Sequence, residues 1–388
     1  TGVMTTPTGV QADPLALLRQ RTSSKWTAYP PEVLPMFVAE MDFPLAPAIA
    51  ARLVGMIGRS DTGYEPRGPG LGRAFAGFAA DLWGWELDPA TVQATTNVVV
   101  ALTELVRAAI EPGDRVLLNS PVYYPFYGLI EEAGGVVADA PLALGEAGWA
   151  LDLDAIEAAY ADGVRVHVLC HPHNPVGVAH PRETLARLAE LAAEHGVLLL
   201  SDEIHGPLAH SDGGFVPYLA VSEAARATGI AVTSASKAFN IPGLGCAFWV
   251  PGGEAAARRV ARMPESVRHR AGHFGAHAAT AAFDESRDWL AGVVASIEAN
   301  RRRLGELLAE QLPEAVYHEP RAGYLAWLDF RPLGWGDDPA RRILERGAVA
   351  LSAGRPFGKD TGRGFARLNF ACSPEVLEEG VRRIATAR

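Results

Sequence analysis

Blocks of apolar and polar positions follow one another from about Asp88 to Val250 and predict strands and helices in turn. The apolar runs predict strands at Arg115–Leu118, Val164–Cys170, Val197–Ser201 and Ile230–Ser234. The blocks between them predict helices at Val99–Ala109, Phe126–Ala133 and Arg182–His195. Because strands that alternate with helices build parallel sheets, we expect an α/β region with a mainly parallel sheet between helices.

The pattern changes after Pro251, where a helical region begins that includes Trp289–Leu312. An α+β segment starts at Val316–Phe330, and the chain ends with a predicted helix at Pro374–Thr386. We therefore expect an N-terminal arm of residues 1–33 and a large ligand-binding α/β domain of residues 51–288. Residues 34–50 and 289–388 would form a small α+β domain that closes over a substrate.

Composition narrows the class of protein. A length of 388 residues allows two domains and a large core, and 48% of the residues are hydrophobic. The net charge of −10 argues against nucleic acid or an anionic membrane as a partner. No apolar stretch reaches the ~18 residues of a membrane-spanning helix. Cys170, Cys246 and Cys372 lack metal-like spacing, so a reducing, cytoplasmic setting is expected.

Lys237 is the first candidate for chemistry. It lies in Ser234-Ala-Ser-Lys-Ala-Phe-Asn-Ile-Pro-Gly243, among small residues and directly after a predicted buried strand. Partial burial of an amine favours its neutral form, which a nucleophilic or Schiff-base lysine requires. A structural role is the alternative for a lysine taken alone.

Asp202 follows the apolar run that begins at Val197 and therefore lies at the carboxyl end of a strand, where open α/β sheets bind ligands. A buried carboxylate needs a partner. A pyridinium nitrogen, a helix N-terminus and a metal ion all fit this requirement.

Two polar side chains lie in other apolar contexts. Asn174, in Cys170-His-Pro-His-Asn-Pro-Val-Gly177, can place a donor over a flat ligand, while metal binding by the His171/His173 pair is disfavoured. Arg367 lies within the strand pattern Gly364–Phe370, where its planar fork matches a carboxylate. A structural ion pair is the alternative for Arg367.

Asn174, Asp202, Lys237 and Arg367 stand in the order and on the local patterns of the fold-type I pyridoxal-phosphate enzymes, and the chain resembles the class I/II aminotransferase superfamily from about Leu34 onward. Within it, the chain is most similar to the cystathionine β-lyase (C–S lyase) branch related to MalY and PatB. The phrases that carry the resemblance are Ala39-Glu-Met-Asp-Phe43, Asn119-Ser-Pro-Val-Tyr-Tyr-Pro-Phe-Tyr127, Ser201-Asp-Glu-Ile-His205, Ser236-Lys-Ala-Phe-Asn-Ile-Pro-Gly-Leu244 and Tyr324-Leu-Ala-Trp-Leu-Asp329. The resemblance implies a mainly parallel seven-stranded sheet.

The resemblance also implies residue roles. Lys237 would hold pyridoxal 5′-phosphate as a Schiff base and then remove the Cα proton of the substrate. The resemblance further implies roles for ten other residues: Asp202 at the pyridine nitrogen, Asn174 and His205 at the ring 3′-oxygen, Tyr123 on the ring face, Ser234, Ser236 and the amides of Val98 and Val99 at the phosphate, and Arg367 with Ala39 at the substrate carboxylate.

One departure from the family pattern and two further features complete the expectation. Gly245 stands where aminotransferases of this superfamily carry a phosphate-binding arginine, which favours the C–S lyase branch. Tyr64 matches a tyrosine that reaches the phosphate in the other subunit, so the resemblance implies a homodimer with shared active sites. His269, His273 and His277 would share one helix face, yet nearby glycines weaken such a helix, and no metal site is expected.

The expected function is therefore α,β-elimination on cystathionine or a related cysteine S-conjugate, which releases a thiol, pyruvate and ammonia. The first alternative is an aminotransferase of broad amino acid range, since the same carbanion can be reprotonated on the cofactor. The second is a non-catalytic ligand-binding or regulatory protein. The expected partner is a small amino acid, with no role for nucleic acid or membrane.

Overall fold

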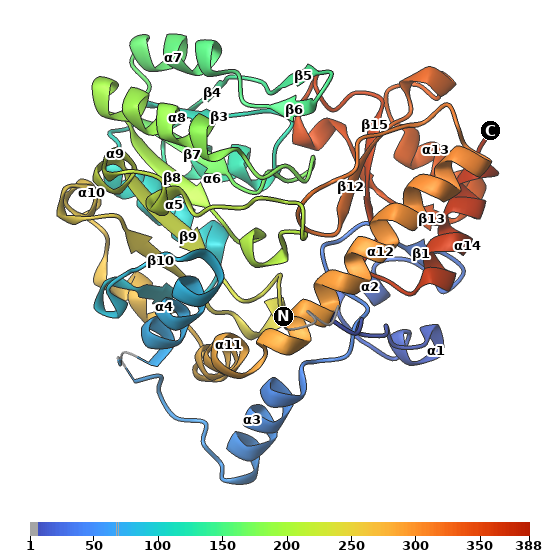
Figure 1. Ribbon diagram of the computed structural model, residues 1–388, viewed down its shortest axis with the longest axis horizontal. Coiled ribbons are helices and arrows are strands. Elements are labelled where there is room, and N and C mark those ends of the chain that lie inside the picture. Colours follow the sequence, from blue (N-terminus) through green and yellow to red (C-terminus); the bar gives the residue numbers. More distant parts are fainter. Residues whose placement is uncertain (1–6, 67, 69) are drawn as a thin grey trace, which may run out of the picture.

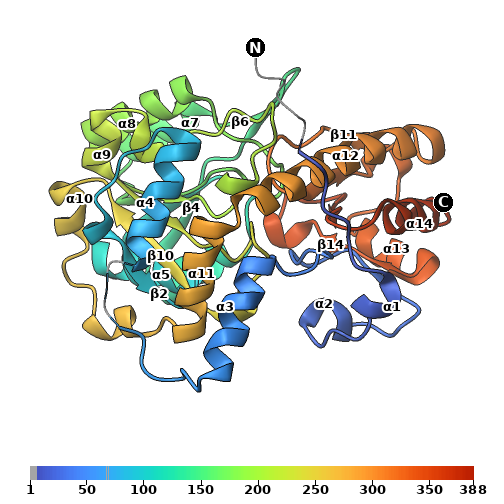
Figure 2. The same cartoon turned by 60° about the horizontal axis from the view of Figure 1, so that its bottom comes forward.

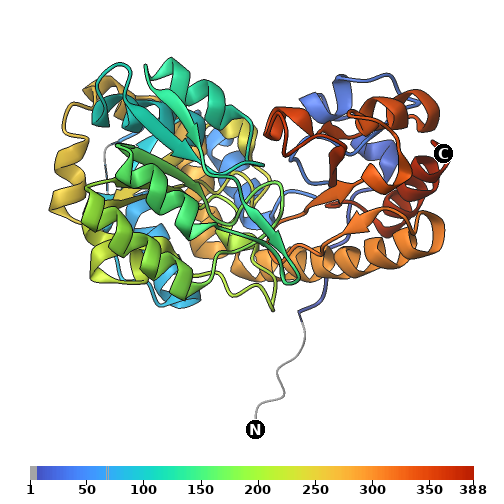
Figure 3. The same cartoon turned by 90° about the horizontal axis from the view of Figure 1, so that it is seen from above.

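The computed structural model describes residues 7–66, 68 and 70–388 (Figure 1). The first six residues of the predicted N-terminal arm therefore lie outside the described residues. Seen from above, the chain forms a larger α/β part and a smaller α+β part side by side (Figure 3). None of the helices in the described part of the chain is both long and apolar enough to span a bilayer.

The larger part is built on a seven-stranded sheet, which confirms the predicted mainly parallel arrangement. β9, β8, β7, β3 and β4 are parallel, whereas β10 runs antiparallel to both of its neighbours. In spatial order the strands are β2 (Gln93–Thr95), β10 (Ala247–Pro251), β9 (Gly229–Thr233), β8 (Leu198–Asp202), β7 (Val166–Cys170), β3 (Arg115–Leu118) and β4 (Val136–Asp139).

Helices cover both faces of this sheet because its inner strands are apolar on both sides. In β8, Leu198 and Leu200 face one core and Leu199 faces the other. The first core is closed by α5 (Val98–Ala109), α6 (Pro125–Glu132) and α10 (Glu254–Arg259). The second is closed by α4 (Gly70–Trp83), α7 (Leu153–Ala161), α8 (Arg182–His195), α9 (Glu223–Thr228) and α11 (His273–Glu285).

The smaller part is built on a four-stranded antiparallel sheet in the order β11, β12, β15, β14. A short parallel pair, β1 with β13, joins the N-terminal segment to it. The elements of this part are β1 (Leu34–Pro35), β11 (Val316–Tyr317), β12 (Leu325–Asp329), α13 (Pro339–Gly347), β13 (Val349–Ala350), β14 (Ser352–Ala353), β15 (Phe365–Asn369) and α14 (Pro374–Ala385).

The remaining elements connect and flank the two parts. The long helix α12 (Arg287–Gln311) runs from the larger part along the smaller one (Figures 1 and 3). Figure 2, a turned view, shows α3 (Pro47–Gly58) beside α11 at the lower edge of the molecule. The flanking elements are α1 (Leu15–Leu18), α2 (Ser24–Thr27), α3 (Pro47–Gly58) and the hairpin β5 (Ala143–Gly145) with β6 (Gly148–Ala150).

Predicted boundaries differ from the observed ones by one or two residues at most ends. The three histidines do not share one helix face, because His269 ends a separate 3-10 segment (Glu265–His269) and α11 begins only at His273, in keeping with the nearby glycines. The segment Arg270–Gly272 interrupts the helical hydrogen bonds between them, so only His273 and His277 share a face. The predicted division into domains stays a prediction.

Candidate active site

Lys237 lies in the turn that follows β9, four residues beyond the last residue of the strand, and its amine points toward the segment that enters the smaller part. Its Nζ donates to the carbonyl of Ala39 at 3.1 Å. Burial, with a smaller contribution from the cationic Arg367, lowers the pKa of Lys237 to about 8. A substantial fraction of this amine is therefore neutral near physiological pH, unlike that of an exposed lysine.

Asp202 is the last residue of β8, one strand away from Lys237, and only 3% of it is exposed. Its Oδ1 accepts one hydrogen bond, from the amide of Ile204 at 3.2 Å. Burial raises the pKa of Asp202 to about 7, and the nearby Lys237 opposes this shift. Because Asp202 neither caps an α-helix nor meets other ligands of a metal cluster among the described residues, its carboxylate is suited to a cationic ligand.

Arg367 projects from the middle of β15 toward the same edge. Its Nη1 donates to Asn174 Oδ1 at 3.1 Å, and its Nη2 donates to the carbonyl of Phe37 at 3.0 Å. Its Nε has no hydrogen-bond partner, and burial lowers the pKa of Arg367 to about 10. No carboxylate in the described ranges forms an ion pair with Arg367, so the structural ion pair considered for it is wrong and an anion site remains free.

The segment 37–42, which we call the crossing segment, passes between these groups and is held by side chains from distant elements. Tyr324 donates its hydroxyl to Ala39 O at 2.9 Å, beside the amine of Lys237. Asn240 accepts a hydrogen bond from the amide of Met41 and donates one to its carbonyl, each at 2.9 Å. Asn369 donates to the carbonyls on either side of Ala39, at 2.7 and 2.6 Å. The crossing segment thereby ties both parts of the chain to the site.

A buried ion pair fixes the far end of the crossing segment. Lys25 Nζ lies 2.6 Å from Asp42 Oδ1, and both side chains are at most 2% exposed. Burial raises the pKa of Asp42, while Lys25 opposes that shift. Lys25 is thus committed to its carboxylate partner, which leaves its amine unavailable for other chemistry.

The N-terminus of α5 presents backbone donors without partners among the described residues. Asn97 caps the helix by accepting from the amide of Val100 at 2.9 Å, while the amides of Val98 and Val99 have no partner within the described ranges. Exposed amides at a helix N-terminus bind anions. Gly245 lies near Thr96 with φ +63°, a left-handed conformation in which a side chain is strained.

The two predicted phosphate-binding hydroxyls differ. Ser234 already donates its proton to Cys246 O at 2.6 Å and accepts from the amide of Ser236, so its hydroxyl has no second proton to give. The hydroxyl of Ser236 forms no hydrogen bond with any described residue and is available as a donor.

Tyr123 and His205 occupy the remaining sides. The half-buried Tyr123 donates its amide to Asn174 O at 3.0 Å, and burial together with Asp202 raises the pKa of its phenol to about 12. His205 is 6% exposed, and burial lowers its pKa to about 3. Its Nδ1 is buried without a hydrogen-bond partner. A neutral imidazole with a free nitrogen therefore lies beside Asn174, Lys237 and Arg367.

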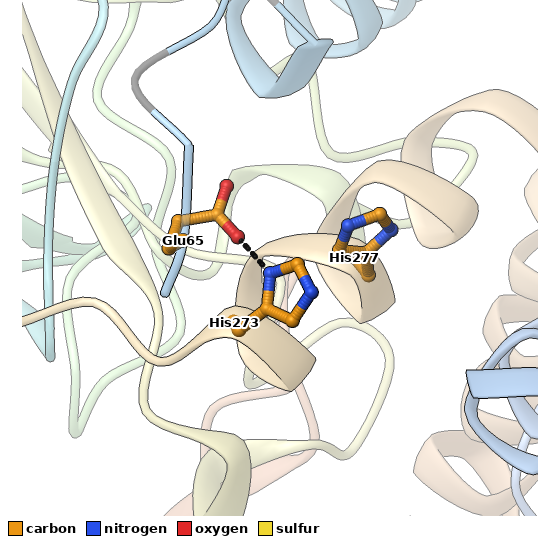
Figure 4. A group of neighbouring side chains, drawn as sticks. All are labelled: Glu65, His273 and His277. Atoms are coloured by element: carbon orange, nitrogen blue, oxygen red, sulfur yellow. Dashed lines mark hydrogen bonds and ion pairs between the residues drawn. The ribbon is translucent and has the colours of Figure 1, made fainter. Parts of the chain in front are cut away.

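Tyr64 is the one predicted site residue that the structure leaves away from this group. It is fully exposed on the loop before α4. Glu65, the next residue, lies 2.7 Å from Nδ1 of His273 on α11 (Figure 4). Asp61 lies 3.1 Å from Nε2 of the same imidazole. Within one chain Tyr64 therefore contributes nothing to the site around Lys237.

Sequence reasoning did not assign Tyr324, Asn240 or Asn369 to the site. Each lies in a segment that the sequence analysis had already singled out: Asn240 follows Lys237, Tyr324 begins the segment Tyr324–Asp329, and Asn369 lies two residues after Arg367. A polar side chain inside an apolar strand or a buried turn was the available signal, since such groups must find hydrogen-bond partners. The partners, in the crossing segment, are far away in sequence and could not be predicted.

The chain is similar to known proteins over most of its length. The family model for aminotransferase class I and II matches residues 57–384. A Mycobacterium tuberculosis protein named "Putative cystathionine beta-lyase" is 41% identical, with 95% of each chain covered. Cystathionine beta-lyase PatB of Bacillus subtilis is 34% identical, with 92% of each chain covered.

Solved structures confirm the predicted type I fold of this superfamily. A crystal structure from Corynebacterium diphtheriae, described as a "putative plp-dependent beta-cystathionase", superposes with a TM-score of 0.91 at 34% identity and covers 98% of this chain and 99% of that one. The match to the family model spans most of the chain and includes β8, which carries Asp202, and the segment after β9, which carries Lys237. The chain belongs to the aminotransferase class I and II family, among relatives that carry the name cystathionine β-lyase.

Proposed function

We propose that the chain is a pyridoxal 5′-phosphate-dependent C–S β-lyase that cleaves cystathionine or a related cysteine S-conjugate into a thiol, pyruvate and ammonia. The observation that carries the proposal is the convergence of a partly neutral amine, a buried carboxylate and a buried arginine without an ion-pair partner. Asp202 ends β8, Lys237 follows β9, and Arg367 lies in the middle of β15, so the three side chains come from two sheets. The names of the relatives support the same activity.

The residues present fit this cofactor. The chain contains only three lysines: Lys25 is locked in a buried ion pair, Lys359 is exposed, and Lys237 alone lies in the site. Asp202 accepts one hydrogen bond and can accept another from a cationic donor, and His205 has a buried nitrogen without a partner among the described residues. Asn174 and His205 would lie at the ring 3′-oxygen, and Tyr123 on the ring face.

The phosphate of the cofactor would lie at the N-terminus of α5. The amides of Val98 and Val99 and the hydroxyl of Ser236 are its proposed donors. Ser234 would act through Ser236, whose amide it accepts, because its own proton is used. The left-handed conformation of Gly245 disfavours an arginine there, so the backbone and hydroxyls carry this role.

When bound, pyridoxal phosphate supplies an electron sink that stabilises negative charge at the substrate Cα. The chain supplies the proton transfer. Lys237 has a lowered pKa, so its amine can take the Cα proton, while Asp202 favours a positive charge on the ring nitrogen. Arg367 and the crossing segment at Ala39 hold the substrate carboxylate and orient the Cα–H bond.

Product analysis with L-cystathionine tests the function. Purified protein with pyridoxal phosphate and no keto acid is expected to release pyruvate and homocysteine in equal amounts. Formation of an amino acid from added 2-oxoglutarate, without pyruvate release, would instead identify an aminotransferase. The family model and the 29% identity to a probable N-succinyldiaminopimelate aminotransferase are consistent with this alternative. Absence of both reactions, with no cofactor uptake, would identify a non-catalytic protein.

Replacing Arg367 with lysine is expected to raise KM for the amino acid by about 10- to 100-fold, since a lysine cannot form the two parallel bonds that a guanidinium gives a carboxylate. Steady-state pyruvate release measures the effect. Arg331→Lys is the matched control, because Arg331 pairs with Asp329 near the surface of the same sheet. Equal KM values in Arg367→Lys and the parent would contradict the assignment.

The lowered pKa of Lys237 predicts how cofactor capture depends on pH. Only the neutral amine attacks an aldehyde, so the capture rate of the cofactor-free protein should rise with pH and level off above about 8. An unperturbed lysine, with a pKa of about 10.4, would show a rate that still rises tenfold per pH unit at pH 9. Stopped-flow absorbance of the yellow product distinguishes the two profiles.

We further propose a homodimer in which Tyr64 reaches the cofactor phosphate of the partner subunit. α3 presents Val54 and Ile57, 68% and 62% exposed, a few residues before the fully exposed Tyr64 in the sequence. Val54→Asp with Ile57→Asp should therefore yield a monomer in light scattering, whereas Leu144→Asp on the β5–β6 hairpin should not. A monomeric parent protein would overturn the dimer.

Tyr64→Phe should weaken cofactor binding without changing the molar mass of the dimer in light scattering.

The same proposal includes a cytoplasmic location. Cys170, Cys246 and Cys372 are all unpaired and buried, which suits a reducing compartment. Fractionation of the producing cells with an antibody against the chain would test this location.

A further inference from the structure

We propose that Glu65, His273 and His277 form a binding site for a transition-metal cation of the Zn²⁺ class. The three side chains converge between α11 and the loop that precedes α4 (Figure 4). One ligand atom from each lies within 4.8 Å of the other two. The group lies outside the site around Lys237 of the same chain.

The two histidines are held by a helix rather than by a loop. His273 is the first residue of α11 and His277 lies four positions later, so both rings project from one face, with centroids 4.7 Å apart. α11 packs against α3 and α4, which fixes its position. The pair is therefore a rigid half of a site, and Glu65 completes it from a separate segment.

The donor set selects the metal. Two imidazole nitrogens and one carboxylate oxygen suit Zn²⁺, whereas Mg²⁺ and Ca²⁺ prefer oxygen ligands. In a tetrahedral site with bonds of about 2.0–2.1 Å, ligand atoms lie roughly 3.3 Å apart, so small side-chain rotations would close the group. A cleft of about 1030 Å³, lined in part by Glu65 and His273, borders the group and leaves a fourth position for water.

Charged neighbours determine the affinity. In the metal-free structure, Glu65 and Asp61 both contact the imidazole of His273, so two carboxylates face the place of the cation. Arg52 is the opposing cation: its Nη1 lies 3.5 Å from His277 Nδ1, although Glu285 shares its charge at 3.0 Å.

A bound cation would fasten the loop to α11. Glu65 directly follows Tyr64, so a bond from Glu65 through the metal to His273 and His277 would restrict where the exposed Tyr64 can lie. Only this consequence rests on the proposed homodimer. The cation site itself can be present or absent whatever the reaction is.

Calorimetric titration of the holoenzyme with Zn²⁺ tests the site. A His195→Ala background removes the other potential cluster, the exposed Glu157, Glu194 and His195. One site per chain is expected, and His273→Ala and His277→Ala should each weaken binding at least about tenfold. His318→Ala, at an exposed histidine elsewhere, is the matched control and should leave the affinity unchanged.

A variant with the opposite expected effect keeps the test independent of folding. Arg52→Gln removes the opposing cation and should tighten Zn²⁺ binding several-fold, while Glu65→Gln, which keeps the shape of the side chain, should weaken it. Circular dichroism would verify that each variant is folded. The proposal is overturned if the parent binds no Zn²⁺, or if folded His273→Ala and His277→Ala variants bind it as the parent does.

Discussion

Replacing Lys237 with alanine is expected to lower pyruvate release from L-cystathionine by at least about 10²–10⁴-fold. This is the contribution of one positioned acid–base group, and the loss of covalent attachment should increase it. The physical reason is that Lys237 provides the only amine within the site: of the other two lysines, Lys25 is paired with Asp42 and Lys359 is exposed. A coupled assay for pyruvate, without keto acid, measures the loss.

Two controls separate a role in chemistry from a role in folding. Lys359→Ala removes a lysine at the surface and should retain the parent rate. Borohydride reduction of the parent protein with its cofactor, followed by peptide mass spectrometry, should label the peptide that contains Lys237 and neither of the others. A label on Lys25 or Lys359, or a Lys237→Ala variant of normal rate, would refute the assignment.

The second large effect is expected for Asp202→Asn. Asparagine has nearly the same shape and can still accept from the amide of Ile204, but it carries no charge. A neutral amide cannot hold the proton on the ring nitrogen of the bound cofactor, so stabilisation of charge at Cα is lost. Removal of one such electrostatic contact costs about 10²–10³-fold in rate. The rate constant for pyruvate formation at saturating substrate measures it.

Glu203→Gln is the matched control for Asp202→Asn. Glu203 is the next residue, is 4% exposed, and bonds Ser201 and the amide of Tyr218 on the far side of the strand. Its loss should lower stability and leave the rate of the folded protein nearly unchanged. If Glu203→Gln loses as much rate as Asp202→Asn, the loss would come from removing a buried carboxylate at the end of β8. A contact between Asp202 and the ring would then not explain it.

Features that depend on residues close together in sequence could be predicted, whereas those that depend on contacts between distant residues could not. The order of strands and helices in the larger part was predictable, because periodicity is a local property that repeated burial imposes on every element. Lys237, Asp202 and Asn174 could be proposed as one group because each follows a parallel strand, and all such strands end at one edge. Arg367 could be proposed because an arginine in an apolar strand needs a partner.

Only the tertiary structure decided which groups share a hydrogen bond. Lys237 and Tyr324, 87 positions apart, meet at the same carbonyl of Ala39, and Glu65 reaches His273 across 208 positions. Local pattern carries no information about such contacts, since they depend on how separately formed layers pack. The sequence by itself determined the elements, the family and the chemical groups of the site, whereas packing over long chain separations decided the crossing segment, the free face of Arg367 and the pair of histidines beside Glu65.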